Sequence, residues 1–223
     1  MPAKQSGFSA VRPPEDESLF ERIAEGIESR GYIALPAALP GPVTESLLHY
    51  LGRFQASHFH PARIGRGTGE AHNRFVRRDR IAWMESDDPD AEAWFAWTER
   101  LKSYLNRRLF LGLFSFESHF AHYAPGDFYR KHLDAFRGDS NRVLTLVTYL
   151  NRGWEPDQGG ELVLYAPDDG DEIGKVVPGF GTLVIFLSEE FPHEVLAAGR
   201  DRYSVAGWFR INGSINRQLD PPR

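Results

Sequence analysis

Cysteine is absent from the chain, which excludes disulfide bonds, thiolate metal sites and cysteine nucleophiles. A run of about 18 apolar residues is also absent, so the sequence predicts no membrane-spanning helix. The 26 Lys and Arg residues are outnumbered by 31 Asp and Glu, and the net charge of −5 gives no basic footprint for nucleic acid across the whole chain. Any metal site must therefore use His, Asp, Glu or backbone oxygen.

Residues 1–16 lack the apolar stretch of a secretory signal and are instead polar and interrupted by proline. We expect a loose N-terminal arm over these residues and a cytoplasmic location. Residues 17–223 are long enough for one domain with a substantial core, and 41% hydrophobic residues is ordinary for a globular protein.

The first part of this domain, residues 17–112, has the sequence pattern of helices. Apolar residues recur near the 3.6-residue period, Ser18 is a candidate N-cap, and Gly31 and Pro42 are a stop and a start signal. The helices expected here cover about residues 18–30, 42–51 and 90–110, with short strands at residues 32–35 and 81–84.

From residue 113 short apolar runs alternate with turns rich in Gly, Pro, Asp and Asn, which is typical of a β-sandwich or barrel. Helices followed by such strands predict an α+β fold in which a jelly roll, or double-stranded β-helix, over residues 113–213 is buttressed by the N-terminal helices. The expected strands cover residues 116–123, 143–150, 161–165, 175–177, 182–187 and 203–211.

His132 and Asp134 stand two residues apart, a spacing that puts both side chains on one face of a strand. His193 follows the apolar run TLVIFL. Two imidazoles and one carboxylate on one side of a metal leave its other positions open, which is the facial triad of non-haem iron(II) oxygenases. Chance predicts about 0.5 H-x-D pairs in a chain of this composition, so the weight of this pair depends on the residues around it.

Arg202 begins the last apolar strand and shares a face with Trp208, where an unpaired cation is costly to bury. We expect it to bind the distal carboxylate of 2-oxoglutarate with both arms of its guanidinium. Tyr123 and Tyr149 are expected to reach the same co-substrate from other strands. The alternatives are a solvated arginine and two tyrosines of the core.

Several segments carry a family resemblance, namely GYIALPAALP, RRDRIAWME, YAPGDFYRKHLDAF, RVLTLVTYLN, GGELVLY, FPHEVL and RYSVAGWF. They resemble the prolyl 4-hydroxylase branch of the Fe(II)/2-oxoglutarate oxygenases, and more closely the oxygen-sensing prolyl hydroxylases and their bacterial relatives. The resemblance covers about residues 20–212. It implies a dioxygenase that uses Fe(2+), 2-oxoglutarate and O2, with L-ascorbate as a further candidate. The implied reaction hydroxylates C4 of a prolyl residue in a protein or peptide and releases succinate and CO2.

The resemblance also assigns roles to single residues. The implied iron ligands are His132, Asp134 and His193, and the implied 2-oxoglutarate contacts are Tyr123, Tyr149 and Arg202. Substrate contacts are expected at Arg142, Tyr129, Trp208 and Arg78, and residues 60–80 match a loop that closes over a peptide. No general acid or base is expected beyond the metal site. The turn before His132 and the residues after Asp134 differ from those of the animal enzymes. Both flank the substrate entrance, so the resemblance does not identify the target protein.

Two alternatives stay open. An oxygenase of another branch would act on a free amino acid, another small molecule or an alkylated nucleic-acid base, although the basic loop favours a peptide. A non-catalytic jelly-roll sensor would bind metal alone, although Arg202 argues against it. Four other histidines, His58, His60, His119 and His122, are expected to be surface or packing residues. The segment FVRRDR is either a patch for nucleic acid or an acidic partner or, as is more common for such a charge run, a solvated face. No membrane and no nucleic-acid partner is expected.

Overall fold

The computed structural model describes residues 15–62, 73, 75–135, 141–167, 170–212, 214–215 and 218–219. The helices are α1 (Glu15–Arg30), α2 (Gly41–Gly52) and α3 (Glu92–Leu109). The strands are β1 (Tyr32–Leu35), β2 (His60–Pro61), β3 (Arg80–Trp83), β4 (Leu113–Tyr123), β5 (Tyr129–His132), β6 (Arg142–Tyr149), β7 (Leu162–Tyr165), β8 (Glu172–Val176), β9 (Leu183–Leu187), β10 (His193–Val195), β11 (Arg202–Ile211), β12 (Ser214–Ile215) and β13 (Gln218–Leu219). The expected N-terminal arm lies almost entirely outside the described residues.

Helix α1 begins at Glu15, so the expectation that Ser18 caps it is wrong. Acidic residues are favourable in the first turn of a helix, and the EDES run is therefore helical rather than part of a preceding arm. The helix ends at Arg30, and Gly31 follows with φ of 77°. A Cβ on Gly31 would lie 2.7 Å from the ring of Phe191, so both the turn and the packing require glycine.

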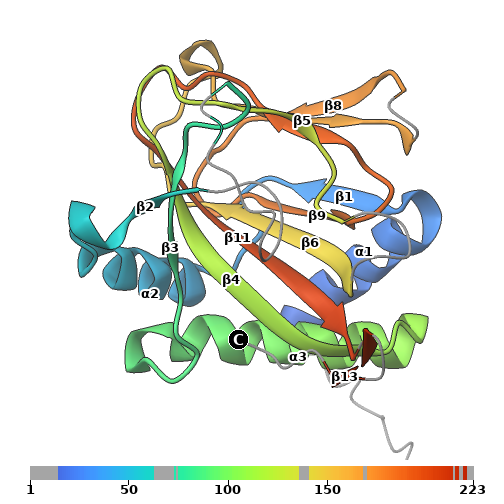
Figure 1. Cartoon of the computed structure of the whole chain (residues 1–223). Helices are drawn as coiled ribbons and strands as arrows, with labels where there is room; N and C mark the ends of the chain where they lie inside the picture. The colour runs from blue at the N-terminus through green and yellow to red at the C-terminus, as the bar shows by residue number, and fades with distance from the viewer. Residues whose placement is uncertain are drawn as a thin grey trace, which may run out of the picture.

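Two antiparallel sheets face each other and form the jelly roll that the sequence predicts (Figure 1). The larger sheet has the order β1-β9-β6-β11-β4-β3-β2, and the smaller one has the order β5-β10-β7-β8. The N-terminal part of the chain supplies β1, β2 and β3 to the larger sheet as well as the helices that cover its outer face. Among the described helices, none combines the length and the apolar character that a membrane crossing requires.

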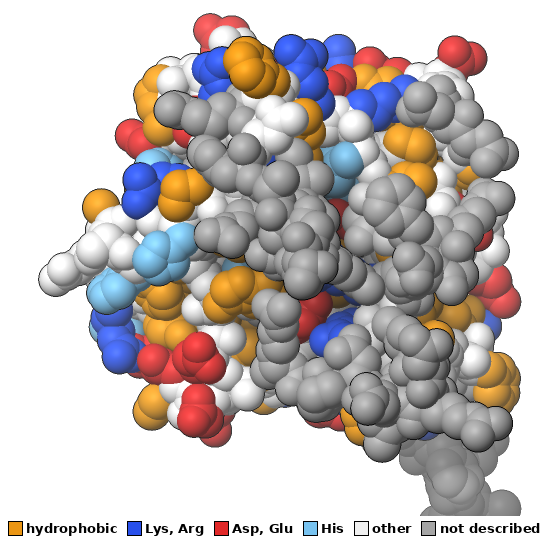
Figure 2. Space-filling model, in the orientation of Figure 1, with side chains coloured by type: hydrophobic (Ala, Val, Ile, Leu, Met, Phe, Trp, Pro, Cys, Tyr) orange, Lys and Arg blue, Asp and Glu red, His pale blue; other side chains and the backbone are white. Residues whose placement is uncertain are grey.

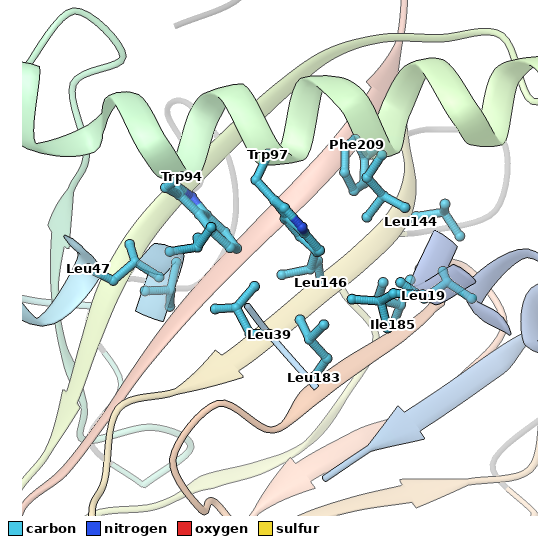
Figure 3. Packing of buried hydrophobic residues seen from close by; sticks show 14 of the residues in the cluster. Leu19, Leu39, Leu47, Trp94, Trp97, Leu144, Leu146, Leu183, Ile185 and Phe209 are labelled. Atoms are coloured by element: carbon cyan, nitrogen blue, oxygen red, sulfur yellow. The ribbon is translucent and has the colours of Figure 1, made fainter. Parts of the chain in front are cut away.

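The outer face of the larger sheet packs on the helices in the main hydrophobic core (Figure 3). Trp94 and Trp97 of α3 are fully buried there and lie parallel, with ring centroids 5.9 Å apart. Trp94 also donates from Nε1 to Ser118 Oγ on β4 over 3.0 Å. Burial of each large apolar side chain contributes roughly 1.5–3 kcal/mol, so this layer holds the sheet to its helices.

The inner face of the larger sheet lines a second core between the two sheets. Alternation along β6 explains how one strand serves both cores, because successive side chains point to opposite faces. Leu144 and Leu146 belong to the helix side, whereas Val147 and Tyr149 belong to the inner side. The same alternation directs Thr145 into the space between the sheets, where the polar site lies.

Candidate metal and co-substrate site

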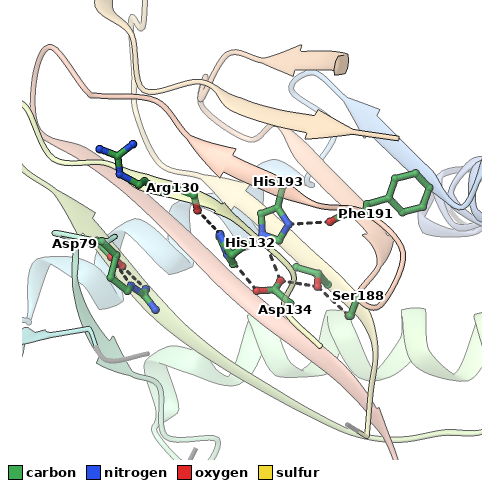
Figure 4. A network of polar contacts seen from close by, with 9 residues as sticks. Asp79, Arg130, His132, Asp134, Ser188, Phe191 and His193 are labelled. Atoms are coloured by element: carbon green, nitrogen blue, oxygen red, sulfur yellow. Dashed lines mark hydrogen bonds and ion pairs between the residues drawn. The ribbon is translucent and has the colours of Figure 1, made fainter. Parts of the chain in front are cut away.

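Three side chains with metal-binding atoms meet between the sheets: His132, Asp134 and His193 (Figure 4). Nε2 of His132 lies 3.6 Å from Asp134 Oδ1, and Nε2 of His193 lies 3.6 Å from Asp134 Oδ2. Within the described part of the chain, no other group of three or more His, Asp or Glu residues converges in this way. The structure therefore brings together the three residues that the sequence predicts as metal ligands.

The three residues come from separate elements. β5 ends at His132, which lies opposite His193 at the start of β10 in the smaller sheet. Asp134 lies in a bend beyond the end of β5, so the expectation that it shares a strand face with His132 is wrong. The bend turns the carboxylate back toward both imidazoles, and a hydrogen bond of 2.8 Å from Thr145 on β6 holds it there.

Backbone carbonyl groups select the protonated nitrogen of both imidazoles. His132 Nδ1 lies 2.8 Å from the carbonyl oxygen of Arg130, and His193 Nδ1 lies 3.1 Å from that of Phe191 (Figure 4). A carbonyl oxygen can only accept, so each Nδ1 carries the proton. The lone pair is then on Nε2, which points to Asp134, and this is the arrangement that an imidazole needs to bind a metal.

The charges at this site also suit a divalent cation. Burial and the neighbouring His132 together lower the pKa of His193 to about 4, with Asp134 opposing them, so His193 is neutral at pH 7. Burial would raise the pKa of Asp134, but His193 and His132 together lower it well below its usual range. Two imidazoles and one carboxylate are the donor set that non-haem iron(II) binds.

Arg202 begins β11 and is a buried cation, with 1% of its surface exposed. Its Nε donates to the carbonyl oxygen of Gly160 over 2.8 Å, and its Nη1 donates to Ser204 Oγ over 3.2 Å. The guanidinium carbon lies 4.7 Å from the ring centroid of Tyr123 and 5.0 Å from that of Tyr149. No carboxylate of the described residues forms an ion pair with Arg202, although a buried charge ordinarily requires one.

The hydroxyl of Tyr149 is buried and has no hydrogen-bond partner among the described residues. Burial raises its pKa to about 12, so the hydroxyl stays protonated and can donate. A guanidinium without its anion and an orphan hydroxyl together fit a small carboxylate ligand. The residues present thus fit both iron and 2-oxoglutarate.

Of the predicted substrate contacts, Tyr129 lies at the metal site. Its ring stacks on that of His132, with centroids 3.5 Å apart and an interplanar angle of 15°. Arg78, in contrast, is exposed, and its guanidinium lies 4.9 Å from the ring centroid of Phe128. The predicted loop over residues 60–80 is described at residues 60–62, 73 and 75–80, and its segment RIGRGTG lies outside the described residues.

Arg142 and Trp208 form one cluster on the inner face of the larger sheet. The Arg142 guanidinium lies 3.6 Å from the ring centroid of Trp208 and donates to the carboxylate of Glu117 over 2.9 Å. Arg210 donates to the other oxygen of Glu117 over 3.1 Å. Trp208 Nε1 is buried without a hydrogen-bond partner among the described residues, which leaves one donor for a ligand.

The expectation that FVRRDR is simply a solvated face is wrong for Arg77 and Asp79. Asp79 is 1% exposed and receives two hydrogen bonds from Arg77, of 2.8 Å and 2.6 Å. The Arg77 guanidinium also lies 4.1 Å from the ring centroid of Tyr129, which itself stacks on His132. The R-x-D spacing, which puts both side chains on one face of extended chain, is the signal that could have identified this pair.

The remaining histidines lie apart from the triad. His58 and His60 are exposed, as expected, and His58 Nδ1 accepts the backbone N–H of Gln55 over 2.9 Å. Figure 2 shows His side chains at the edge of this face over β2, and side chains of both charge signs mixed across the described surface. His119 is buried between the rings of Trp83 and Trp208, which is the packing role expected for it.

A jelly roll with a His-Asp-His triad, and with a buried arginine that has no carboxylate partner among the described residues, defines an iron(II)- and 2-oxoglutarate-dependent oxygenase. The chain belongs to the 2OG-Fe(II) oxygenase superfamily, whose sequence pattern matches residues 118–210. It is therefore a dioxygenase with Fe(2+) as cofactor and 2-oxoglutarate and O2 as co-substrates.

Comparison with known proteins places the chain near prolyl hydroxylases. It is similar to the crystal structure of a Pseudomonas putida prolyl-4-hydroxylase, at 38% identity and a TM-score of 0.77, over 87% of this chain and 100% of that one. A Trichoplax adhaerens prolyl hydroxylase, solved with a hypoxia inducible factor oxygen degradation domain peptide, matches at 27% identity and a TM-score of 0.76, over 88% and 90% of the two chains. Prolyl hydroxylase EGLN3 of Mus musculus is 27% identical over 169 residues, which are 73% of this chain and 68% of that protein.

Proposed function

We propose that this enzyme hydroxylates a prolyl residue at C4 in a protein or peptide substrate and releases succinate and CO2. The relatives named as prolyl hydroxylases support the substrate class. The observation that carries the co-substrate is the buried Arg202, which has no carboxylate partner among the described residues. A site that bound only a metal ion would not require a buried cation that lacks a carboxylate partner among the described residues.

In this proposal His132, Asp134 and His193 hold the iron through their converging nitrogen and oxygen atoms. When bound, iron supplies the activation of O2 that couples decarboxylation of 2-oxoglutarate to hydroxylation of the substrate. Arg202 binds the distal carboxylate, and the protonated Tyr149 hydroxyl donates a further hydrogen bond to the co-substrate. Arg202 and Tyr149 are buried, and the low dielectric of a buried site strengthens both interactions.

We propose that the substrate lies over the cluster of Arg142, Trp208 and Glu117 and over Tyr129 at the metal site. The free Nε1 donor of Trp208 supports this, because a bound peptide carbonyl would satisfy it. Arg78 and the loop of residues 60–80 belong to the same proposal as substrate contacts. A cytoplasmic location and the use of L-ascorbate also belong to it, and cell fractionation and turnover with and without ascorbate test them.

The test measures succinate production and substrate mass with Fe(II), 2-oxoglutarate and O2. Proline-containing peptides are compared with matched peptides in which alanine replaces the proline, and with free proline and other free amino acids. We expect succinate in proportion to peptides that gain one oxygen atom, with no gain in the alanine controls. Faster coupled turnover with a free amino acid would contradict the peptide substrate, and a protein that binds iron without any coupled turnover would be a sensor.

A further inference from the structure

Two buried hydroxyl groups lead to the carboxylate of the triad (Figure 4). Thr145 Oγ1 lies 2.8 Å from Asp134 Oδ2 and 2.9 Å from Ser188 Oγ. Thr145 is 1% exposed and Ser188 is fully buried. Thr145 is on β6 of the larger sheet, Ser188 directly follows β9, and Asp134 follows β5 of the smaller sheet. The hydroxyl pair thus joins the two sheets at the triad.

The direction of both hydrogen bonds follows from the protons available. An ionised carboxylate can only accept, and a hydroxyl has a single proton to donate. The 2.8 Å contact runs from the Thr145 hydroxyl to the carboxylate, so Thr145 donates its proton to Asp134 Oδ2. Ser188 must then be the donor to Thr145 Oγ1. Hydrogen bonds in such a chain polarise one another, so Ser188 strengthens the bond that reaches Asp134.

This arrangement distinguishes the two oxygen atoms of Asp134. Oδ2 carries the bond from Thr145, whereas Oδ1 lies 3.6 Å from His132 Nε2 without a hydroxyl donor among the described residues. Because Asp134 lies in a bend rather than in a ladder of backbone hydrogen bonds, its side chain depends on such contacts for its orientation. Because the hydrogen bond from Thr145 holds Oδ2, the carboxylate presents Oδ1 as its single ligand atom.

We propose that Thr145 is a positioning residue for the metal ligand Asp134, and that Ser188 orients the Thr145 hydroxyl. This inference rests on the proposed function, because it concerns the iron ligand of that site. Hydrogen-bond partners of metal ligands typically account for 10–100-fold in metal affinity. Replacing Thr145 by valine keeps the shape of the side chain and removes its donor, so the loss belongs to the hydrogen bond.

β6 offers a matched control. Thr148 is fully buried on the same strand, and its hydroxyl has no hydrogen-bond partner among the described residues. Thr148→Val therefore makes the same chemical change without removing a hydrogen bond. Thr145→Ser keeps the donor and loses a methyl group. Ser188→Ala removes only the second hydroxyl of the chain.

The experiment titrates Fe(II) anaerobically into the full chain with saturating 2-oxoglutarate and follows the visible charge-transfer band of the complex. Thermal unfolding of each metal-free variant is measured alongside. We expect Thr145→Val to weaken iron binding by about 10–100-fold and to alter the band, with Thr145→Ser and Thr148→Val close to the unchanged protein. Ser188→Ala should weaken iron binding by a smaller factor. The unfolding temperature of metal-free Thr145→Val should resemble that of Thr148→Val.

Unchanged iron affinity and an unchanged band in a folded Thr145→Val variant would overturn the inference. An equal loss of iron in Thr148→Val would also overturn it, because packing and not the hydrogen bond would then be responsible. If Thr145→Val does not fold, Ser188→Ala decides, and unchanged iron affinity there counts against the proposal. Absence of iron binding by the unchanged protein would instead refute the proposed function.

Discussion

The buried guanidinium of Arg202 determines which kind of ligand this site can bind. Its guanidinium is held by Gly160 and Ser204 but has no carboxylate partner among the described residues. A Cβ on Gly160 would lie 3.1 Å from Arg202 Cδ and from Trp154, and the backbone there has φ of 71°. Glycine at this position therefore keeps the arginine in place for its ligand.

Arg202→Ala should weaken 2-oxoglutarate binding by roughly 3–5 kcal/mol, the range for breaking a buried ion pair, and should affect iron much less. Arg202→Lys should be partly defective, because it keeps the charge but loses the planar fork. Calorimetric titration of 2-oxoglutarate into the metal-loaded variants measures both effects. An unaltered 2-oxoglutarate affinity in Arg202→Ala would contradict the assignment.

Asp134→Ala should abolish stoichiometric iron binding and nearly all turnover, because it removes the one carboxylate of the triad. Equilibrium dialysis with Fe(II), combined with succinate assays, measures this loss. The double variant His58→Ala with His60→Ala is the control, since both side chains are exposed and lie outside the triad. Loss of iron in the double variant, or full activity in Asp134→Ala, would show that the wrong ligands were chosen.

His119 should make the free energy of unfolding depend on pH. Burial, Arg77 and Arg142 together lower its pKa to about 4, and Asp79 opposes them. An unfolded histidine titrates near 6.5, so the unfolded state takes up the proton first as the pH falls. Stability should fall between about pH 6.5 and pH 4 by an amount on the order of 3 kcal/mol. Denaturant unfolding of His119→Gln should show a shallower pH dependence in this window, and an identical slope would refute the assignment.

At the level of elements, β5 is supported by the extended segment that precedes β3. The backbone N–H of Arg78 donates to the carbonyl of Phe128 over 3.1 Å, and that of Arg130 donates to Val76 over 2.8 Å. Arg77 and Asp79 of the same segment form an ion pair, and the Arg77 guanidinium lies against the ring of Tyr129. Since Tyr129 stacks on His132, the segment supports the strand that ends at a candidate ligand.

Asp79→Ala should therefore destabilise the fold by about 3–5 kcal/mol, because it breaks a buried charge pair. It should also weaken iron binding through Tyr129 and His132. Glu45→Ala is the matched control, because it breaks the exposed pair with Arg152 and should cost less than about 1 kcal/mol. Denaturant unfolding and Fe(II) titration measure both variants, and equal stability losses in the two would contradict the prediction.

On the scale of the whole molecule, the larger sheet separates an apolar layer from a functional one. Its outer face packs on α1, α2 and α3, whereas its inner face carries Arg202, Tyr149 and Thr145 toward the smaller sheet. The helices thus stabilise the sheet without entering the site. Among the described residues of this inner side, Arg202 without a carboxylate partner and the Tyr149 hydroxyl are available to a ligand.

Iron and 2-oxoglutarate should consequently stabilise the whole fold. Each ligand that binds only the native state adds about 2.7 kcal/mol at a concentration of 100 Kd, which corresponds to a rise in Tm of about 5–10 °C for a domain of this size. Anaerobic thermal scans with Fe(II) and 2-oxoglutarate, repeated after addition of EDTA, measure the effect. An unfolding temperature that is the same with and without the ligands would contradict a shared site.

Short-range patterns in the chain were sufficient for much of the fold. β1 spans Tyr32–Leu35 as expected, and Gly31 ends α1, because strand alternation and a left-handed glycine are local properties. The residue types of the triad and Arg202 were likewise recognisable from their spacing and family resemblance. A strand at His132 was expected from the H-x-D spacing, but β5 ends before Asp134, and β10 was not predicted because it is short and carries polar side chains for the site.

Only the tertiary structure decided how Asp134 is held and what Arg77 and Asp79 do. A bend, not a strand, carries Asp134, and its donor Thr145 comes from the opposite sheet. In the sequence Arg77 and Asp79 resemble a solvated charge run, but in the fold Asp79 is buried and Arg77 lies against the ring of Tyr129 on β5. Periodicity reports which face of an element is apolar, whereas the burial of a charge and the partner of a hydroxyl depend on segments that are distant in the chain.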